Sequence, residues 1–196
     1  MNKKSKNAIW IGIVVIVVVI VGTIIGTYNN LASAENDVDA DWSQVENVMQ
    51  RRADLVPNLV ESVKGSMQQE QEIFGNITEA RKSYNDASTP EEKVAANDDL
   101  SRELSTMVNV IRESYPELGS NENVKTLMSQ LEGTENRIST ERRRYIQSVN
   151  TYNKLLVRFP NNMIAGLFNF ERKDNFEADD DAKEVPKVDF NIDTSE

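Results

Sequence analysis

The chain has 196 residues, contains no histidine or cysteine, and carries a formal net charge of −10 from 32 acidic and 22 basic side chains. The missing residue types exclude Ser-His-Asp and Cys-His catalytic systems, zinc sites with His or Cys ligands, disulfides and lipidated cysteines. Carboxylates remain as acid–base groups or as oxygen ligands of Ca²⁺ or Mg²⁺, and the acidic balance predicts no binding to nucleic acid.

The first predicted element is a membrane-spanning helix over Ala8–Tyr28. This stretch is uncharged and would be roughly 32 Å long as a helix, close to the ~30 Å hydrocarbon core of a bilayer. The alternatives are a buried helix of a soluble domain and a signal peptide cleaved after Ala32–Ala34, but the apolar run is longer than a signal peptide requires. We therefore expect an uncleaved anchor that contacts the lipid bilayer through residues 8–28.

The charges that flank this span predict its orientation. Three lysines precede it, at positions 3, 4 and 6, whereas the first basic residue after it is Arg51. By the positive-inside rule, residues 1–7 form a short cytoplasmic segment and the rest of the chain lies outside.

Two glycines of the span, Gly22 and Gly26, form a GxxxG motif. Small residues at this spacing let two membrane helices approach closely, so the motif suggests a dimer face and a homo-oligomer. Incidental spacing is the alternative, because glycines are frequent in membrane spans.

Beyond the span, apolar residues alternate at spacings of three and four, which is typical of helices packed in a left-handed bundle. The first such helix is predicted to run from Ala34 to about Asn85, with Gly65 and Gly75 weakening the pattern without ending it. A second helix follows a capping box in which Thr89 is the N-cap, Pro90 lies in the first turn and Glu92 completes the box.

The third predicted helix has the most regular seam, from Val124 to Phe159, and Pro160 closes it. An apolar flap comes next and ends at Phe170. From Glu171 onward, ten acidic and four basic residues leave little to bury, so residues 171–196 are predicted to be disordered.

Pro57 interrupts the first of these helices, because it has no N–H to donate to the carbonyl of Ala53. A new helix that starts here would have Val56 as its N-cap, which is a poor capping residue. The apolar seam also continues past the proline without a change of phase. We therefore predict a helix kinked at Pro57, bending back towards its bundle.

Polar residues occupy positions of these seams where leucine is usual. They are Arg52 on the first helix and Thr134, Glu141 and Ser148 on the third, with Glu135 and Arg142 beside them. We expect Arg52, Glu135, Glu141 and Arg142 to form a buried polar layer that fixes helix register, with Arg52 paired to Glu135 or Glu141. The alternatives are arginines that extend to solvent and a carboxylate-based site built from Asp54, Glu135 and Glu141.

Four stretches together resemble the bacterial LemA family. They are YNNL (Tyr28–Leu31), WSQVENVMQRRADLVPNLVESVKG (Trp42–Gly65), LEGTENRI (Leu131–Ile138) and YNKLLVRFPNNMIAGLFNF (Tyr152–Phe170). The resemblance ends before the acidic tail. It implies one N-terminal membrane span and a four-helix up-and-down bundle over residues 29–170, whereas periodicity alone gives three helices. A fourth helix requires a break in the Gly65–Gly75 region.

The resemblance implies no enzymatic activity, no catalytic residue and no cofactor. We expect a scaffold or adaptor in the bacterial cytoplasmic membrane, with its bundle outside, that binds an unidentified membrane or envelope protein. A self-assembling spacer is the alternative, and a carboxylate or divalent-metal enzyme is the remote one, since di-iron bundles use histidines that this chain lacks.

Overall fold

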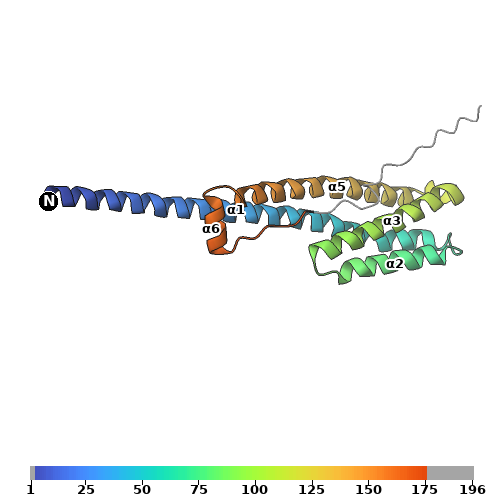
Figure 1. Ribbon diagram of the computed structural model, residues 1–196. Coiled ribbons are helices and arrows are strands. Elements are labelled where there is room, and N and C mark those ends of the chain that lie inside the picture. The colour runs from blue at the N-terminus through green and yellow to red at the C-terminus, as the bar shows by residue number, and fades with distance from the viewer. Residues whose placement is uncertain (1–2, 176–196) are drawn as a thin grey trace, which may run out of the picture.

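The structure is a computed structural model that describes residues 3–175. Within this part of the chain every regular element is a helix (Figure 1). The helices are α1 (Lys3–Lys64), α2 (Gln71–Asp86), α3 (Pro90–Ser114), α4 (Pro116–Gly119), α5 (Glu122–Leu156) and α6 (Asn161–Phe168). The predicted all-α fold, an apolar N-terminal helix followed by further helices, is confirmed.

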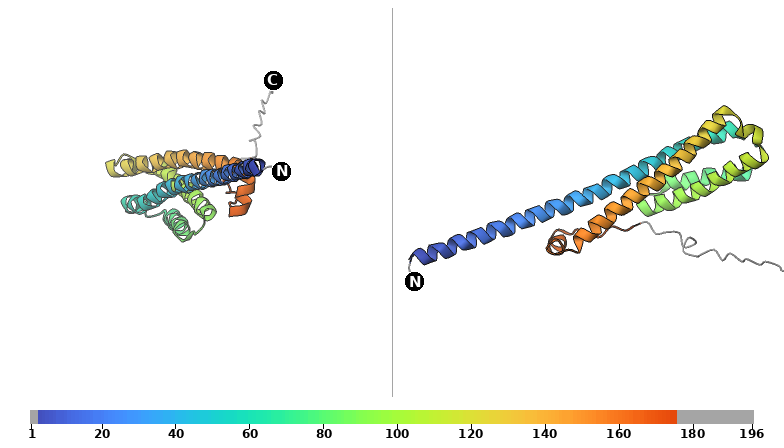
Figure 2. Two further views of the ribbon diagram at one scale, coloured as in Figure 1. Left: turned by 90° about the vertical axis from the view of Figure 1, so that its left-hand side faces the viewer. Right: turned by 90° about the horizontal axis from the view of Figure 1, so that it is seen from above.

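Helix α1 is one 62-residue helix that carries the predicted span directly into the helical domain. Its N-terminal part extends alone beyond the other helices, and its C-terminal part packs along α5 (Figures 1 and 2). Helices α2 and α3 form a second, shorter pair beside the end of α1 that is far from the N-terminus. Each long helix runs opposite to the one before it.

The predicted apolar seams form the core between these helices. Buried seam residues are Val38, Val45, Met49, Arg52, Val56, Leu59 and Val63 on α1, Asn97, Leu100, Leu104, Met107 and Ile111 on α3, and Val124, Leu131, Thr134, Ile138, Tyr145 and Tyr152 on α5. Trp42 and Tyr145 meet edge to face across the α1–α5 pair, with ring centroids 5.7 Å apart. Burial of these seams supplies the main driving force for packing the helices.

The predicted extent of the first helix is wrong, because α1 ends at Lys64 and α2 begins at Gln71. The carbonyl of Val63 accepts hydrogen bonds from the backbone N–H groups of both Ser66 and Met67, which turns the chain. This turn lets Phe74, Ile77 and Tyr84 pack with α3, whereas a continued helix would have carried them away from it. The break lies in the region where the LemA resemblance required one.

Two other predicted helix ends can be compared with the structure. The capping box at the start of α3 is confirmed, since the Thr89 hydroxyl accepts from the Glu92 N–H and the Glu92 carboxylate accepts from the Thr89 N–H. The third helix ends at Leu156, earlier than predicted, so Phe159 lies outside the seam and is 80% exposed. The apolar flap after it is the short helix α6.

The predicted tail lies mostly outside the described residues, since only 171–175 of its residues 171–196 are described. These five residues run from α6 back along the α1–α5 pair (Figure 1). The Asn153 side chain donates to the Lys173 carbonyl at 2.8 Å and accepts from the Lys173 N–H at 3.1 Å. Lys173 Nζ also lies 3.3 Å from Glu35 Oε1. The beginning of the acidic tail is therefore bound to both long helices.

Pro57 lies inside α1, which continues past it to Lys64, so the first reversal of the chain occurs in the turn after Lys64 and not at the proline. The carbonyl that Pro57 leaves without a helical donor is that of Ala53. Arg81 of α2 donates its Nε–H to this oxygen at 2.9 Å. The carbonyl that lacks a donor within α1 thereby forms a specific contact between α1 and α2.

This contact predicts a coupling between Pro57 and Arg81. Arg81→Met should lower the free energy of unfolding by about 1–2 kcal/mol, because it leaves the part-buried Ala53 carbonyl without a donor. In a Pro57→Ala background the same change should cost much less, since an alanine at this position restores the helical hydrogen bond. Urea unfolding of the full-length protein in mild detergent, followed by circular dichroism at 222 nm, measures both costs. The neighbouring Lys82→Met serves as the control, and equal costs of Arg81→Met in the two backgrounds would contradict the coupling.

Candidate functional site

A polar cluster lies where α1, α3 and α5 meet, and Arg52 is its most buried member at 4% exposed. Arg52 Nη1 lies 2.7 Å from Glu135 Oε2 on α5, whose side chain is 52% exposed. Among residues 3–175, Arg52 Nε has no hydrogen-bond partner. Burial lowers the pKa of the Arg52 guanidinium from its usual value, while the Glu135 and Asp98 carboxylates act in the opposite direction.

A second ion pair belongs to the same cluster. Arg142 Nη2 of α5 lies 2.6 Å from Asp98 Oδ1 of α3. Its positive charge contributes to the lowered pKa of Arg52, which places the two pairs within electrostatic reach of each other. The first pair joins α5 to α1 and the second joins α5 to α3. The cluster therefore ties the α2–α3 pair to the α1–α5 pair.

The structure brings together some of the residues predicted for the polar layer and separates others. Arg52 and Glu135 are in contact, and Arg142 joins them through Asp98. Glu141 instead pairs with Arg144 on its own helix, 3.1 Å away. Asp98 was missed by sequence reasoning, although it is next to Asn97, a polar residue on the seam of α3, which would have indicated it.

The carboxylates of the alternative enzymatic site have separate partners. Asp54 accepts from the Gln50 side chain at 2.9 Å, Glu135 pairs with Arg52, and Glu141 pairs with Arg144. In the described part of the chain, no group of three or more carboxylates is arranged to hold a metal ion.

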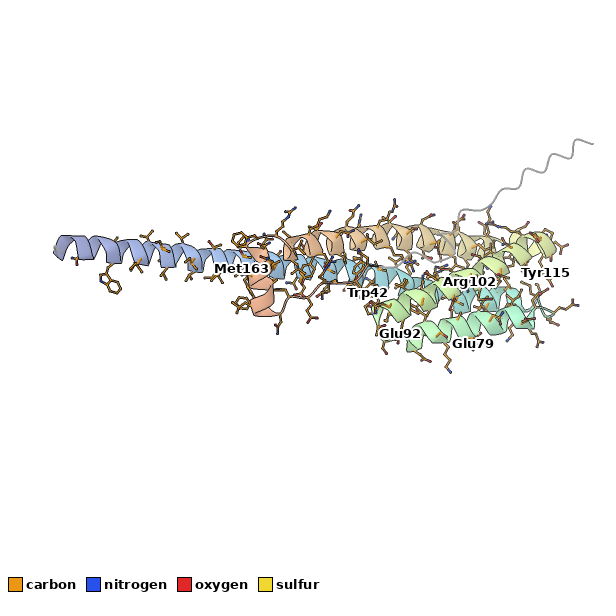
Figure 3. The ribbon with its side chains drawn as sticks, in the orientation of Figure 1. Trp42, Glu79, Glu92, Arg102, Tyr115 and Met163 are labelled. Atoms are coloured by element: carbon orange, nitrogen blue, oxygen red, sulfur yellow. The ribbon has the colours of Figure 1, made fainter. Side chains whose placement is uncertain are left out.

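An open groove of about 480 Å³ runs between α3 and α5 and borders the polar cluster. It is lined by Arg52 of α1, by Ser101, Arg102, Leu104, Ser105, Val108, Asn109 and Arg112 of α3, and by Met128, Leu131, Glu132 and Glu135 of α5. Helix α3 forms one wall of the groove, and Figure 3 labels Arg102 on this helix. Both charged lining residues on the α3 side are arginines, and both on the α5 side are glutamates. The groove thus combines apolar side chains with rims of opposite charge.

Residues 10–28 of the predicted span are exposed apart from Ile24 and Thr27, which are partly buried, and Ile24 packs against the core. The N-terminal part of α1 is the one helix among residues 3–175 that is long and apolar enough to cross a membrane, and its most apolar window is not buried by other elements. A Cβ added at Gly22 or Gly26 would meet no other described part of the chain within 4 Å. Both glycines therefore lie on an open helix surface.

Comparison with known proteins identifies the family. The LemA family matches residues 41–190 of this chain. The chain belongs to the LemA family. The match begins after the YNNL element and continues past Phe170, so the resemblance based on the four stretches ended too early and the family pattern extends into the acidic tail.

Two curated relatives of this LemA-family chain are magnetosome proteins. The chain is 25% identical to magnetosome protein MamQ 2 of Paramagnetospirillum magneticum, over 90% of this chain and 74% of the relative. It is 23% identical to magnetosome protein MamQ of Magnetospirillum gryphiswaldense, over 81% of this chain and 68% of the relative. Neither name assigns a catalytic activity. Support for a membrane location of this chain comes from its exposed apolar helix, which is long and apolar enough to cross a bilayer.

The polar cluster predicts an asymmetry between the two partners of its buried ion pair. Glu135→Gln should lower the free energy of unfolding by about 1 kcal/mol, because a neutral amide no longer balances the charge of the buried Arg52 guanidinium. Arg52→Met should be near neutral or stabilising, because Glu135 is half exposed and can be solvated by water. In the Arg52→Met background, Glu135→Gln should then have almost no cost.

Urea unfolding of the full-length protein in detergent tests this cycle, with Glu132→Gln on the same helix as the control. Equal costs of Glu135→Gln with and without Arg52 would show that the pair is not coupled.

Proposed function

We propose that this LemA-family protein is a non-enzymatic, membrane-anchored adaptor that binds another membrane or envelope protein through the groove between α3 and α5. The groove carries the proposal, because it combines an apolar lining with charged rims at the side of the helical domain. Such a surface suits a helix that buries an apolar face and places charges at both edges.

The chemistry of the groove specifies the partner. The apolar lining of Leu104, Val108 and Met128 takes the apolar face of an amphipathic helix. Arg102 and Arg112 on one rim favour acidic residues along one edge of that helix, and the glutamates on the other rim favour basic residues along the other edge. Arg102 also pairs with Asp99 at 2.9 Å, but both side chains are exposed, so a partner can replace this pair at little cost.

The continuity of α1 supports the anchoring part of the proposal. Residues 8–28 and the core seam of α1 belong to the same helix, so the adaptor is mounted on its membrane span without a flexible linker. We place it in the bacterial cytoplasmic membrane, with the N-terminus cytoplasmic and the helical domain outside, because basic residues precede the span and acidic residues follow it.

A self-assembling spacer is the second candidate function. The open surface at Gly22 and Gly26 favours it, because two spans can approach closely there. The two functions differ in what occupies the groove: a different protein for the adaptor and a second copy of this chain for the spacer.

Photo-crosslinking in intact membranes tests the groove. A benzoylphenylalanine at position 108 or 128 of the full-length protein should form an adduct with one defined protein, identified by mass spectrometry. The same probe at Glu79, exposed on α2 (Figure 3), should not form this adduct. Arg112→Glu should reduce the yield several-fold, whereas Arg137→Glu, an exposed position outside the groove, should leave it unchanged.

The other outcomes of this experiment are equally specific. Adducts between two copies of this chain would support the spacer and overturn the adaptor. Adducts that form equally from position 79, or a yield that does not respond to Arg112→Glu, would show that the groove is not the binding surface.

The orientation predicts the result of a protease experiment on intact spheroplasts. Protease added from outside should degrade the helical domain and leave a small, membrane-embedded N-terminal fragment, whose mass identifies the cut. A cytoplasmic protein should stay intact in the same sample as the control. Protection of the helical domain until the membrane is lysed would reverse the proposed orientation.

A further inference from the structure

Helix α6 and the turn before it expose several large apolar side chains. Met163 is 65% exposed and Leu167 70% exposed, and Val157, Phe159 and Phe168 are exposed as well. The same helix contributes Ile164 and Ala165 to the core. Helix α6 therefore has two apolar faces, one that packs on the protein and another that faces outward. An exposed apolar patch of this kind marks an interaction surface.

Contacts beyond the C-terminal end of α6 hold it in place. At this end, Asn169 adopts a left-handed conformation with φ 57°, and the Phe170 N–H donates to the Ala165 carbonyl. The segment beyond it is bound to α5 through Asn153 and to α1 through the ion pair of Lys173 with Glu35. These contacts orient α6 so that its outward face points away from the protein.

The position of α6 along α1 identifies what its outward face meets. The Tyr28 ring lies 4.9 Å from the Phe168 ring and 5.6 Å from the Phe170 ring, between ring centroids. Tyr28 is the last residue of the predicted span, where aromatic rings occupy the membrane interface. Helix α6 runs crosswise to α1 in Figures 1 and 2, and Met163 lies on it where the two helices cross in Figure 3. When α1 spans a bilayer, α6 therefore lies along the membrane surface.

We propose that α6 and the Val157–Pro160 turn are a second membrane contact, a short interfacial helix whose outward apolar side chains enter the leaflet from which the helical domain emerges. Amphipathic helices lie in this plane with their apolar side chains at the boundary between headgroups and acyl chains. Exposed Lys154, in the last turn of α5, and exposed Arg158, in the turn that follows, are positioned to contact anionic headgroups.

The occupant of this surface is the bilayer rather than a second protein, because the surface is continuous with the membrane span through Tyr28. An isolated helix of eight residues would bind a membrane weakly, but the covalent anchor supplies a high local concentration of lipid. The inference goes beyond the adaptor function. It rests on the membrane span of that proposal and is independent of the groove.

Depth-dependent fluorescence quenching of the full-length protein tests this contact. The chain has no cysteine, so a single introduced cysteine can carry an NBD label. The test positions are Met163→Cys and Leu167→Cys, the aqueous control is Glu79→Cys, and the membrane control is Val17→Cys. The proteins are reconstituted into vesicles of phosphatidylcholine and phosphatidylglycerol. Labels at 163 and 167 should lose most of their emission to lipids with a nitroxide at a shallow acyl position, and little to aqueous iodide.

Each alternative outcome overturns the proposal for a different reason. Quenching by iodide at 163 and 167 as strong as at 79 would show that α6 faces water. Protection from both iodide and nitroxide lipids would show that a protein, such as a second copy, covers it. If no nitroxide lipid quenches a label at position 17, the predicted span does not enter the bilayer, and the membrane anchor of the proposed function is wrong as well. Circular dichroism in vesicles confirms that each labelled variant is folded.

Discussion

The structure depends on one constraint: a single continuous helix, α1, has an apolar N-terminal part suited to lipid and a C-terminal part that packs in a helical domain surrounded by water. Inside a bilayer every backbone group needs an internal partner, so the span must be helical, and it is apolar on all sides. Beyond Tyr28 the buried apolar residues of the same helix form a seam along one face, and α5 packs on this face. Because no break separates the two parts, the direction of the span determines the direction of the helical domain. Elements near Tyr28, such as α6, are consequently held at the membrane surface.

Polar contacts decide where the α2–α3 pair attaches. Apolar seams are permissive about sliding and rotation, whereas a buried donor has few acceptable partners. Three contacts made by part-buried donors lie at the junction: Arg81 with the Ala53 carbonyl, Arg142 with Asp98, and Lys93 with Glu46. The first exists because a proline removed a hydrogen bond from α1. The two ion pairs among these contacts fix register and helix choice more than they add net stability, since replacing both partners of such a pair by apolar residues is often neutral.

Sequence periodicity predicts the buried face of each helix but not the geometry between helices. Seam positions such as Val45 and Ile138 are buried as expected, because a three-four spacing determines one face of a helix. The end of α1 at Lys64 was missed, because the seam keeps its phase across the turn and Met67 is buried even within it. Glu141 was assigned to the polar layer by spacing alone, but its carboxylate pairs with Arg144. The groove has no sequence signature, since it arises from the separation of α3 and α5.

In the proposed adaptor, the distance between the membrane surface and the groove limits which partners the groove can bind. Arg52 borders the groove and lies 24 residues beyond Tyr28 on a continuous helix. At ~1.5 Å per residue, this places the groove roughly 36 Å from the interface when α1 is upright. A partner helix in the groove is therefore outside the bilayer, and a membrane partner needs a stalk or domain of similar height. The proposed contacts through Gly22 and Gly26 would take place within the bilayer, so the proposed dimer face and the proposed groove site could be occupied by separate partners at the same time.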